Sequence, residues 1–222
     1  MRRVSTCAAL AVAACVFTSS SSFANLVSDG DFSSPEAGSP FSTLFAGDAD
    51  GPWIVTGSGC GAYGCAGVDV INDYWSGPPS GGHSVDLDGD APGGLFQTVK
   101  LDSGRKYDLL FYLSANPDGA PTTKTMTVSI GGLDQQLTYT LGGSNSRNNM
   151  NYELENFVFT AKGNNILSFV SDDSGYSPFG AVVGGISITA VPEPATWAML
   201  LFGLFGIGAI TRYARRSAGY TV

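Results

Sequence analysis

The sequence predicts an all-β fold for residues 25–190: a two-sheet antiparallel β-sandwich of the jelly-roll type. Of the 222 residues, 30 are glycine and only 14% are charged, a composition that favours many turns over helical bundles. Short apolar and β-branched segments recur between turn residues, with no helical periodicity between them. Two ends of different composition flank this middle part and are expected to lie outside the sandwich.

The expected strands follow one another along the middle part, each bounded by turn residues. Alternation is clearest where Met126, Val128 and Ile130 alternate with Thr and Ser, so that one face meets a core and the other meets water. Residues 33–52 are rich in Ser, Pro, Gly and Asp and are interpreted as a long loop. The strand candidates are 53–55, 68–71, 83–87, 95–101, 107–114, 125–130, 135–141, 157–161, 166–170 and 185–189.

Charge is distributed unevenly along the chain. The formal net charge is −8, but five of the eleven basic residues lie at the two ends, which leaves six basic against eighteen acidic residues in 25–190. A middle part with a net charge of −12 repels nucleic acid and anionic lipid, which excludes nucleic acid as a partner. The acidic balance is compatible with a soluble domain outside the cell and with divalent cations.

The first 24 residues have the pattern of a cleavable signal peptide. A basic start is followed by an apolar stretch at 8–17, and Ser22-Phe23-Ala24 places small residues at the two positions that a signal peptidase reads. Cleavage after Ala24 would make Asn25 the mature N-terminus. Val12-Ala13-Ala14-Cys15 loosely fits a lipoprotein signal, which is a lesser alternative. An ordinary N-terminal core helix would lack a packing partner in an all-β domain.

The last part of the chain, 191–222, has a different pattern. Val191-Pro192-Glu193-Pro194 precedes an apolar run at 195–210, and an arginine-rich tail follows. As a helix this run reaches about 24 Å, slightly short of a hydrocarbon core of about 30 Å, so its flanks must complete a transmembrane helix. With the arginines in the cytoplasm, both basic ends lie inside and the acidic middle lies outside.

This end resembles the PEP-CTERM sorting signal, in which a Pro-Glu-Pro motif, a transmembrane run and an Arg-rich tail follow in this order. The resemblance implies recognition by an exosortase, a membrane cysteine protease-transpeptidase that would process the chain near Val191-Pro192-Glu193-Pro194 after transient insertion into the inner membrane. It also implies a Gram-negative bacterium that makes exopolysaccharide and biofilm, with the protein at the cell surface or in the extracellular matrix. A plain membrane anchor without cleavage is the alternative.

Several segments of the middle part resemble the bacterial exported proteins called choice-of-anchor C, and their relative, the plant cell-wall domain of unknown function 642. These segments are 26–32, 82–87, 94–99, 114–119 and 185–188, so the resemblance covers most of 25–190. Both families look like galactose-binding-type jelly rolls, which implies that fold here. Members commonly carry an Asp-Asn pair before the last strand. Gly184-Gly185 stands there in this chain, which puts any metal-binding or strand-fixing role of that pair in doubt.

Carboxylates gather at two places that suggest a structural Ca²⁺. Asp86, Asp88 and Asp90 alternate and would point to one face if the strand continued, and three close carboxylates repel unless a cation joins them. Asp29 and Asp31 form a second acidic pair that could approach the first. The EF-hand pattern does not fit, and acidic strand ends that are simply solvated are the alternative.

Cys60 and Cys65 enclose a Gly-rich loop and are the only cysteines left after signal cleavage. In an oxidising compartment they are expected to form a disulfide that closes this loop. A metal site is the alternative, but it would need more soft ligands, and the single histidine, His83, falls on an expected strand.

Aromatic and polar loop residues suggest a carbohydrate-binding surface. Tyr63, Tyr74 and Trp75 fall near the disulfide, and rings on a jelly-roll rim can stack on sugars while amides and carboxylates bind hydroxyl groups. The alternative is that Trp75 simply covers the edge of the core. Further candidates are the polar loop residues Asn116, Asp118 and Arg147.

The sequence contains no nucleophile elbow, phosphate loop, dinucleotide fingerprint or zinc pattern. A non-enzymatic protein is therefore expected, and a glycosidase is a distant alternative because paired Asp residues are common on an acidic surface. Two function classes stay open. One is a module that binds exopolysaccharide or cell-wall glycan, and the other is a structural or adhesive matrix protein without a specific ligand.

Overall fold

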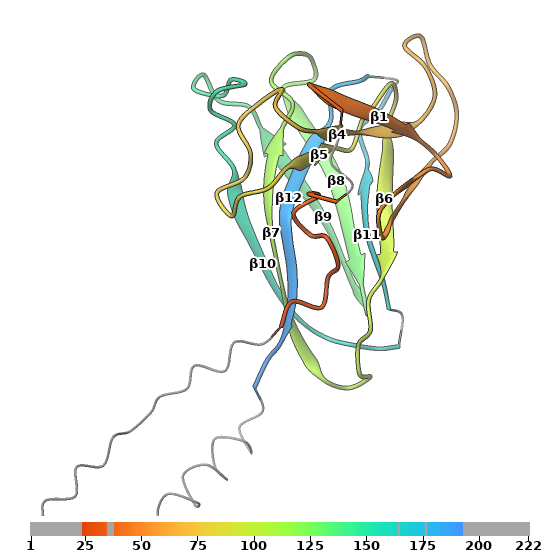
Figure 1. Cartoon of the computed structure of the whole chain (residues 1–222), viewed down its shortest axis with the longest axis vertical. Coiled ribbons are helices and arrows are strands. Elements are labelled where there is room, and N and C mark those ends of the chain that lie inside the picture. Colours follow the sequence, from red (N-terminus) through yellow and green to blue (C-terminus); the bar gives the residue numbers. More distant parts are fainter. Residues whose placement is uncertain (1–23, 35–37, 164, 176, 193–222) are drawn as a thin grey trace, which may run out of the picture.

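A computed structural model describes residues 24–34, 38–163, 165–175 and 177–192. These residues form two six-stranded antiparallel sheets packed face to face, as Figure 1 shows. The expected two-sheet antiparallel sandwich is confirmed. The signal peptide and the C-terminal apolar run fall outside the described residues. Within the described part of the chain, no helix is long and apolar enough to cross a membrane.

Sheet A has the strand order β1-β4-β5-β12-β7-β10, and sheet B has the order β2-β3-β6-β11-β8-β9. The strands of sheet A are β1 (Phe41–Phe45), β4 (Gly67–Ile71), β5 (Ser84–Asp86), β12 (Ala181–Ala190), β7 (Lys106–Ala115) and β10 (Glu153–Thr160). The strands of sheet B are β2 (Ala49–Asp50), β3 (Trp53–Gly57), β6 (Gly93–Thr98), β11 (Ile166–Ser171), β8 (Thr123–Ile130) and β9 (Leu133–Thr140). The chain repeatedly crosses between the sheets, which is jelly-roll-like connectivity.

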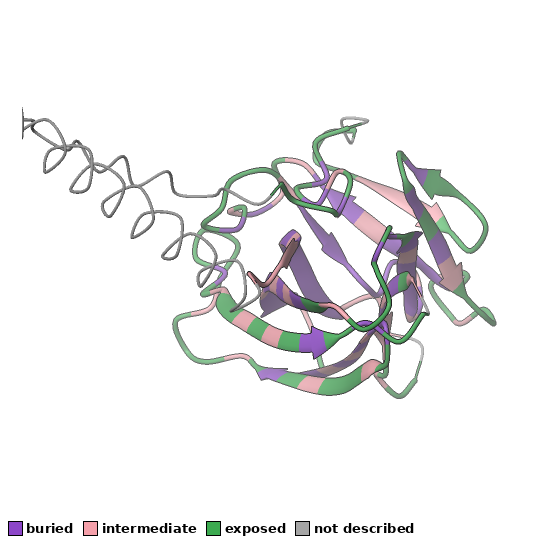
Figure 2. Ribbon diagram, turned by 90° about the horizontal axis from the view of Figure 1, so that it is seen from below, coloured by how far each residue is buried: buried purple, intermediate pink, exposed green. Residues whose placement is uncertain are grey.

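Alternating apolar residues build the core between the sheets. On β8, Met126 and Val128 point inward and are buried, while the threonines beside them are partly exposed. Figure 2 shows buried residues concentrated on strands in the middle of the domain, with exposed residues on the loops and in the striped outer strands. Aromatic rings from both sheets meet there, and Phe111 of β7 lies edge-on to Phe169 of β11 with centroids 5.1 Å apart.

The expectation of a long loop at 33–52 is wrong, because this segment contains β1 and β2. β1 pairs with β4 over its whole length, from Phe41 opposite Ile71 to Phe45 opposite Gly67. The Thr43 hydroxyl also donates a hydrogen bond to Asp69 at 2.6 Å. Contacts with the neighbouring strand therefore outweigh the weak local signal of a short segment between glycines and serines.

β12 lies in the centre of sheet A and contains a bulge. Its register with β7 shifts between Gly184 and Ser187, and Gly185 there has a φ of 60°. A Cβ atom on Gly185 would lie 2.1 Å from the Ser80 hydroxyl oxygen. Glycine is thus required at 185 both by the backbone conformation and by the close approach of the β4–β5 connection.

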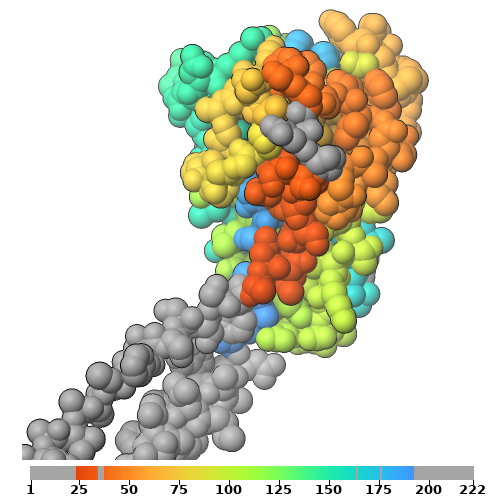
Figure 3. Space-filling model, viewed as in Figure 1, coloured from red at the N-terminus to blue at the C-terminus, as the bar shows by residue number. Residues whose placement is uncertain are grey.

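The N-terminal segment, residues 24–32, runs along β12. The Leu26 N–H donates to the Ile188 carbonyl at 2.9 Å, and the Ile186 N–H donates to the Gly30 carbonyl at 2.8 Å. In Figure 3 this red segment covers much of the blue β12. The first and last described residues consequently leave the domain at the same end.

The connections divide the sandwich into two ends. The loop end contains the long connections 58–66, 87–92, 116–122, 141–152 and 172–180. The terminal end, at the bottom of Figure 1, contains residues 24–26 and 190–192 with the turns 99–105, 131–132 and 161–163. Long loops that carry varied side chains are the usual place for a binding site on such a scaffold.

Replacing the fully buried Phe111 by alanine should lower the free energy of unfolding by about 3–5 kcal/mol, because the ring contacts are lost and a cavity remains. Chemical denaturation of the chain from residue 25, in detergent micelles, measures this change. The control is Phe45→Ala on β1, where the ring is 40% exposed and the loss should be about 1 kcal/mol or less. Equal losses in the two variants would contradict the packing described here.

Candidate functional site

Three connections meet around Tyr74, Asp118 and Arg147, which we call the Tyr74 cluster. Two of them, β7–β8 and β9–β10, belong to the loop end, and the third, β4–β5 (72–83), leaves sheet A close to that end. The Arg147 guanidinium lies over the Tyr74 ring, with its central carbon 4.0 Å from the ring centroid. The Arg147 Nε donates to both carboxylate oxygens of Asp118, at 2.9 and 3.1 Å. Phe41 approaches Tyr74 edge-on, with centroids 5.2 Å apart. Three residues that the sequence offers as separate candidates are thus in direct contact.

A second small core fastens these connections onto the outer face of sheet A. It consists of Ile71, Trp75, Met150 and Val182. Trp75 is only 6% exposed, and its indole N–H donates to the Ser84 hydroxyl at 2.9 Å. The Ser76 N–H donates to the Arg147 carbonyl at 2.7 Å. The structure therefore supports the interpretation of Trp75 as a core residue rather than as a sugar-stacking surface.

The charges of the Tyr74 cluster balance one another. The hydrogen bond to Asp118 raises the pKa of Arg147, and burial followed by Asp118 raises the pKa of Tyr74. The Arg147 side chain is 49% exposed, and no acceptor for its two terminal nitrogens is found among the described residues. These nitrogens can donate hydrogen bonds to an incoming ligand.

Asn116 supports the cluster from below instead of facing solvent. Its amide group donates to Asp86 at 2.7 Å, and its oxygen accepts from the main-chain N–H of Asp118 at 2.9 Å. Asn116 is 5% exposed, so its polar atoms are used within the protein. Its contribution is to hold the β7–β8 connection in place.

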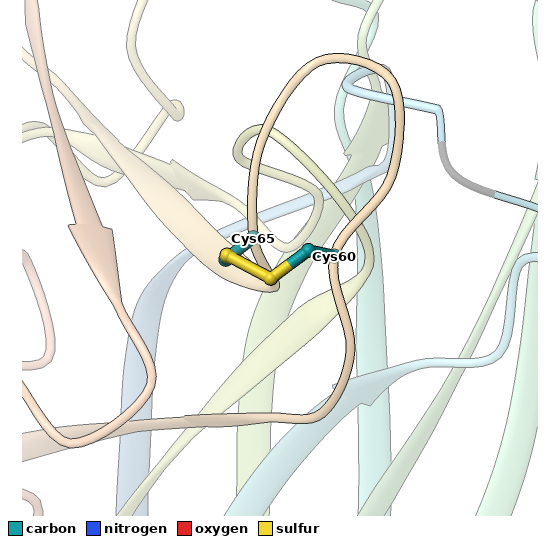
Figure 4. The surroundings of a disulfide bond; sticks show 2 residues. All are labelled: Cys60 and Cys65. Carbon is teal, nitrogen blue, oxygen red and sulfur yellow. A yellow bond between two sulfur atoms is a disulfide. The ribbon is translucent and has the colours of Figure 1, made fainter.

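The disulfide between Cys60 and Cys65 is confirmed, and Figure 4 shows how it closes the β3–β4 connection. Inside the loop, the Gly61 N–H donates to the Gly64 carbonyl at 2.6 Å. Tyr63 at its tip is 65% exposed and, among the described side chains, makes no ring contact with Tyr74 or Trp75. Tyr63 is therefore a separate exposed aromatic residue, not a member of the Tyr74 cluster.

A group of charged side chains lies beneath the cluster at the loop end. Asp86, Asp88 and Lys124 are buried, and Asp173 is half-buried. The Oδ1 atom of Asp86 accepts the main-chain N–H groups of Asp88 and Gly180, both at 3.0 Å. Asp88 is also fully buried, yet neither of its oxygens has a hydrogen-bond partner within the described residues. The Lys124 ammonium donates to the Gly119 carbonyl at 3.0 Å.

Burial controls the protonation of this group. It raises the pKa of Asp88 to about 7, with Asp173 acting in the same direction and the nearby Ser171 hydroxyl and Lys124 acting against it. Burial, and then Asp88, also raises the pKa of Asp86 well above its usual range. Burial lowers the pKa of Lys124, against the attraction of the carboxylates. Burial thus brings the pKa of Asp88 close to neutral pH.

Asp29 and Asp31 lie elsewhere, on the N-terminal segment, where Asp29 comes close to Asp50 of β2. The Oδ1 atom of Asp29 accepts the N–H groups of Ser33 and Ser34, at 2.9 and 3.2 Å. The Oδ2 atoms of Asp29 and Asp50 are buried without a partner in the described structure. Burial, and then Asp29, raises the pKa of Asp50 to about 6. We call these two residues the Asp29–Asp50 pair.

The carboxylates considered for Ca²⁺ are thus spread over different places. β5 ends at Asp86, the chain turns at Gly89, and Asp88 pairs with Pro92, so the expectation of one shared strand face is wrong. Asp90 lies against Gly64 of the disulfide loop, where a Cβ atom would come 2.0 Å from its Oδ2. In the described ranges, no group of three or more His, Cys, Asp or Glu side chains is arranged to hold a metal ion.

A hollow of about 410 Å³ lies between the N-terminal segment and the bulge of β12. Its lining includes both acidic residues of that segment, Asp29 and Asp31, together with Ser80 of the β4–β5 connection. Gly185, at the bulge of β12, forms part of its wall. The hollow is therefore continuous with the Asp29–Asp50 pair through Asp29.

Sequence reasoning missed Phe41, Asp50, Lys124 and Asp173. For Lys124 a signal exists, because it occupies an inward position of the same alternation as Met126 and Val128. No comparable alternation marks Asp50 and Asp173, because both lie next to turns that are rich in polar residues. Their proximity to other carboxylates depends on strands far apart in the sequence.

The processing sites are only partly described. Ala24 and Asn25 are exposed, and Val191 and Pro192 directly follow β12. Glu193 and Pro194 lie outside the described residues. Signal cleavage after Ala24 and processing near Val191–Pro194 remain predictions.

Comparisons with known proteins give two family matches. Residues 25–184 match the family described as "Protein of unknown function (DUF642)", and residues 190–217 match the "PEP-CTERM protein-sorting motif". Among curated proteins, a stretch of 50 residues is 42% identical to Halomucin of Haloquadratum walsbyi. That match covers 22% of this chain and, rounded, 0% of Halomucin, so this chain spans only a very small part of that relative.

Two solved structures illustrate the likeness in fold. TmCBM61, in complex with beta-1,4-galactotriose, is 14% identical, with a TM-score of 0.41 over 76% of this chain and 99% of its own. A family 35 carbohydrate binding module from Clostridium thermocellum is 13% identical, with a TM-score of 0.42 over 68% of this chain and 98% of its own. At such low identity and TM-score, neither likeness identifies a ligand for this chain.

The raised pKa of Asp88 predicts in which direction the free energy of unfolding changes with pH. A carboxyl group with a folded pKa of about 7 and an ordinary value of 3.8 stabilises the fold at low pH, and this contribution is lost as the pH rises through 7. Asp88→Asn should therefore raise the free energy of unfolding at pH 8, by about 1–3 kcal/mol, and weaken its fall between pH 5 and 8. Denaturation at several pH values measures this, with the exposed Asp102→Asn as control. An unchanged pH slope in Asp88→Asn would contradict the assignment.

Proposed function

Residues 25–184 belong to the DUF642 family of proteins of unknown function, and from this premise we propose that the chain is an exported, surface-sorted protein that binds carbohydrate through its Tyr74 cluster. The observation that carries the proposal is the convergence of Tyr74, Asp118 and Arg147 from three connections. The ligand class we propose is a neutral or mixed polysaccharide, either exopolysaccharide or cell-wall glycan.

The PEP-CTERM motif at 190–217 indicates export and sorting to the surface. We propose that a signal peptidase removes residues 1–24 and that the segment 195–210 holds the precursor in the inner membrane. An exosortase then processes the chain near Val191-Pro192-Glu193-Pro194. Both described ends of the domain lie at its terminal end. The connections that carry Asp118 and Arg147 are at the opposite end of the strands from this attachment point.

The chemistry of the Tyr74 cluster matches what sugar hydroxyl groups require. A hydroxyl group both donates and accepts, so a carboxylate beside a guanidinium can bind two neighbouring hydroxyls at once. Arg147 covers one face of the Tyr74 ring, and the 36% exposed Phe41 beside it offers an aromatic surface for contact with sugar C–H groups. Binding through these groups needs no rearrangement of the connections, because Trp75 and Met150 already hold them on sheet A.

We propose a binding role without catalysis. The buried carboxylates Asp86 and Asp88 lie beneath the surface and are fully covered, so they do not meet a polysaccharide chain. A matrix protein without a specific ligand is the second candidate. The many acidic residues of the sandwich are compatible with this role, and it becomes the favoured one if no glycan binds. A glycosidase would be recognised by turnover.

We also propose that the Asp29–Asp50 pair holds a structural Ca²⁺. Both Oδ2 atoms are buried without a partner in the described structure, and burial next to another carboxylate is unfavourable unless a cation or a proton is present. Two carboxylates supply only part of the six to eight oxygens that Ca²⁺ takes, so main-chain oxygens and water must complete the shell. An affinity in the millimolar range, as in other extracellular modules, follows from this low number of charged ligands.

For carbohydrate binding, we expect Arg147→Ala to weaken the affinity for the producing bacterium's exopolysaccharide about tenfold or more, because the guanidinium donates directly to the ligand. Calorimetry on the chain from residue 25 in detergent micelles measures the affinity. Tyr63→Ala is the matched control, since it removes a more exposed aromatic residue outside the cluster. An unchanged affinity in Arg147→Ala would rule out the Tyr74 cluster, and no saturable binding in the unaltered chain would favour the matrix protein.

For the cation, 10 mM CaCl₂ should stabilise the chain by about 1 kcal/mol relative to EDTA, a few degrees in Tm, if the dissociation constant is about 1–2 mM. Asp50→Asn should abolish this shift, whereas Asp90→Asn, away from the pair, should leave it intact. Thermal unfolding measured at pH 7.5 tests both variants. The same Tm in CaCl₂ and EDTA for the unaltered chain would exclude the proposed site.

A further inference from the structure

Basic residues are concentrated at the terminal end of an otherwise acidic domain. Four of the six basic residues of 25–190 lie on its turns or at the first residue of β7: Lys100, Arg105, Lys106 and Lys162. Asp102 is the one acidic residue of the turns 99–105, 131–132 and 161–163. The remainder of 25–190 carries two basic and seventeen acidic residues. The net charge of −12 is thus unevenly distributed, and the turns of the terminal end are net basic.

Main-chain hydrogen bonds hold these turns together as one surface, which we call the basic end. The Gly104 N–H donates to the Ala161 carbonyl at 2.8 Å, and the Lys162 N–H donates to the Gly131 carbonyl at 2.8 Å. Figure 1 shows the yellow-green turn 99–105 at the bottom of the sandwich, beside the described start and end of the domain. The basic residues therefore share one face although they are up to 62 positions apart in the sequence.

The lysines of the basic end are exposed and unpaired. Lys100, Lys106 and Lys162 form no ion pair among the described residues, whereas Arg105 lies 3.6 Å from Asp102. The one other lysine in the chain, Lys124, is fully buried at the loop end. Every accessible lysine of the protein is thus at the end from which the chain continues toward its sorting motif.

No linker separates the basic end from that motif. The Val191 N–H donates to the Lys106 carbonyl at 3.0 Å, so the domain is still hydrogen-bonded where the motif begins. From Pro192 to the start of the apolar run at Ala195, the chain can span about 10 Å. This reach is similar to the Debye length of about 8 Å at physiological salt. A bilayer that holds the apolar run would therefore act electrostatically on the basic end.

We propose that the basic end docks on the anionic headgroups of the bilayer in which the precursor is anchored, and so holds the loop end outward. This inference rests on the proposed membrane-anchored precursor. The partner is a lipid surface for two reasons. The four cations lie on neighbouring turns with exposed or half-exposed side chains, and the apolar run at 195–210 brings a bilayer to that end of the domain. Clustered lysines and arginines next to a membrane segment are attracted to anionic lipid in this way.

The experiment uses the chain from residue 25 to 222 inserted into nanodiscs of phosphatidylcholine, with or without an equal part of phosphatidylglycerol. A water-soluble acetylating reagent labels the lysines, and mass spectrometry gives the rate for each one. On phosphatidylglycerol, Lys100, Lys106 and Lys162 should be labelled at least about threefold more slowly than on phosphatidylcholine. The difference should disappear in 0.5 M NaCl, because salt screens the attraction.

A fluorophore attached at position 143 in the β9–β10 connection, as Gly143→Cys, reports orientation by energy transfer to labelled lipid. Gly143 is exposed, and a Cβ atom there meets no other atom within 4 Å. The triple change Lys100→Gln, Lys106→Gln, Lys162→Gln should increase the transfer on phosphatidylglycerol nanodiscs, because the domain can then tilt. The control Glu153→Gln changes one exposed charge at the first residue of β10, away from the basic end, and should leave the transfer unchanged.

Different outcomes separate this inference from the proposed function. A chain that does not co-elute with nanodiscs would overturn the anchored precursor and the docking together. If the chain co-elutes but its lysines are labelled equally fast on both lipids, the docking alone is overturned. The same holds if 0.5 M NaCl leaves the protection of the lysines intact. Protection that depends on added exosortase and not on lipid charge would likewise overturn it, in favour of a protein partner.

Discussion

The hydrogen-bonded ladder between β12 and β7 is the interaction on which the rest of the structure depends. It runs from Ala181 opposite Ala115 at the loop end to Ala190 opposite Tyr107 at the terminal end. Just before it, Gly180 contributes the N–H that holds Asp86, and just after it, Val191 begins the sorting motif. A single central strand therefore connects the buried carboxylates, the core and the attachment point, and a change in its register would alter all three.

Much of the fold could be predicted from local sequence. The alternation at β8 and the disulfide loop between Cys60 and Cys65 carry their own signals, and both agree with the structure. β1 and β2 could not be predicted in this way, because their pairing with β4 and β3 supplies what their own residues lack. The strand at Ala181–Ala190 is longer than its apolar pattern indicates, since β5 and β7 on either side extend it.

The candidate site shows the same division. Residue type identified Tyr74, Asp118 and Arg147 as candidates, but only the packing of three distant connections brings them into contact. Residue type also suggested Trp75, and here packing gave a different answer, because Met150 and Ser84 enclose its ring. The net charge of the domain predicted repulsion from anionic lipid in a comparable way. A sum over the whole domain contains no information about the end at which each charge lies.

The side-by-side position of the two chain ends has a consequence for how such domains can be arranged. Leu26 and Ile188 are hydrogen-bonded neighbours, so the chain enters and leaves the sandwich at one point. Copies joined end to end would therefore not build a stalk that grows in height with each repeat. They would lie next to one another as a layer one domain thick, with every loop end on the same side.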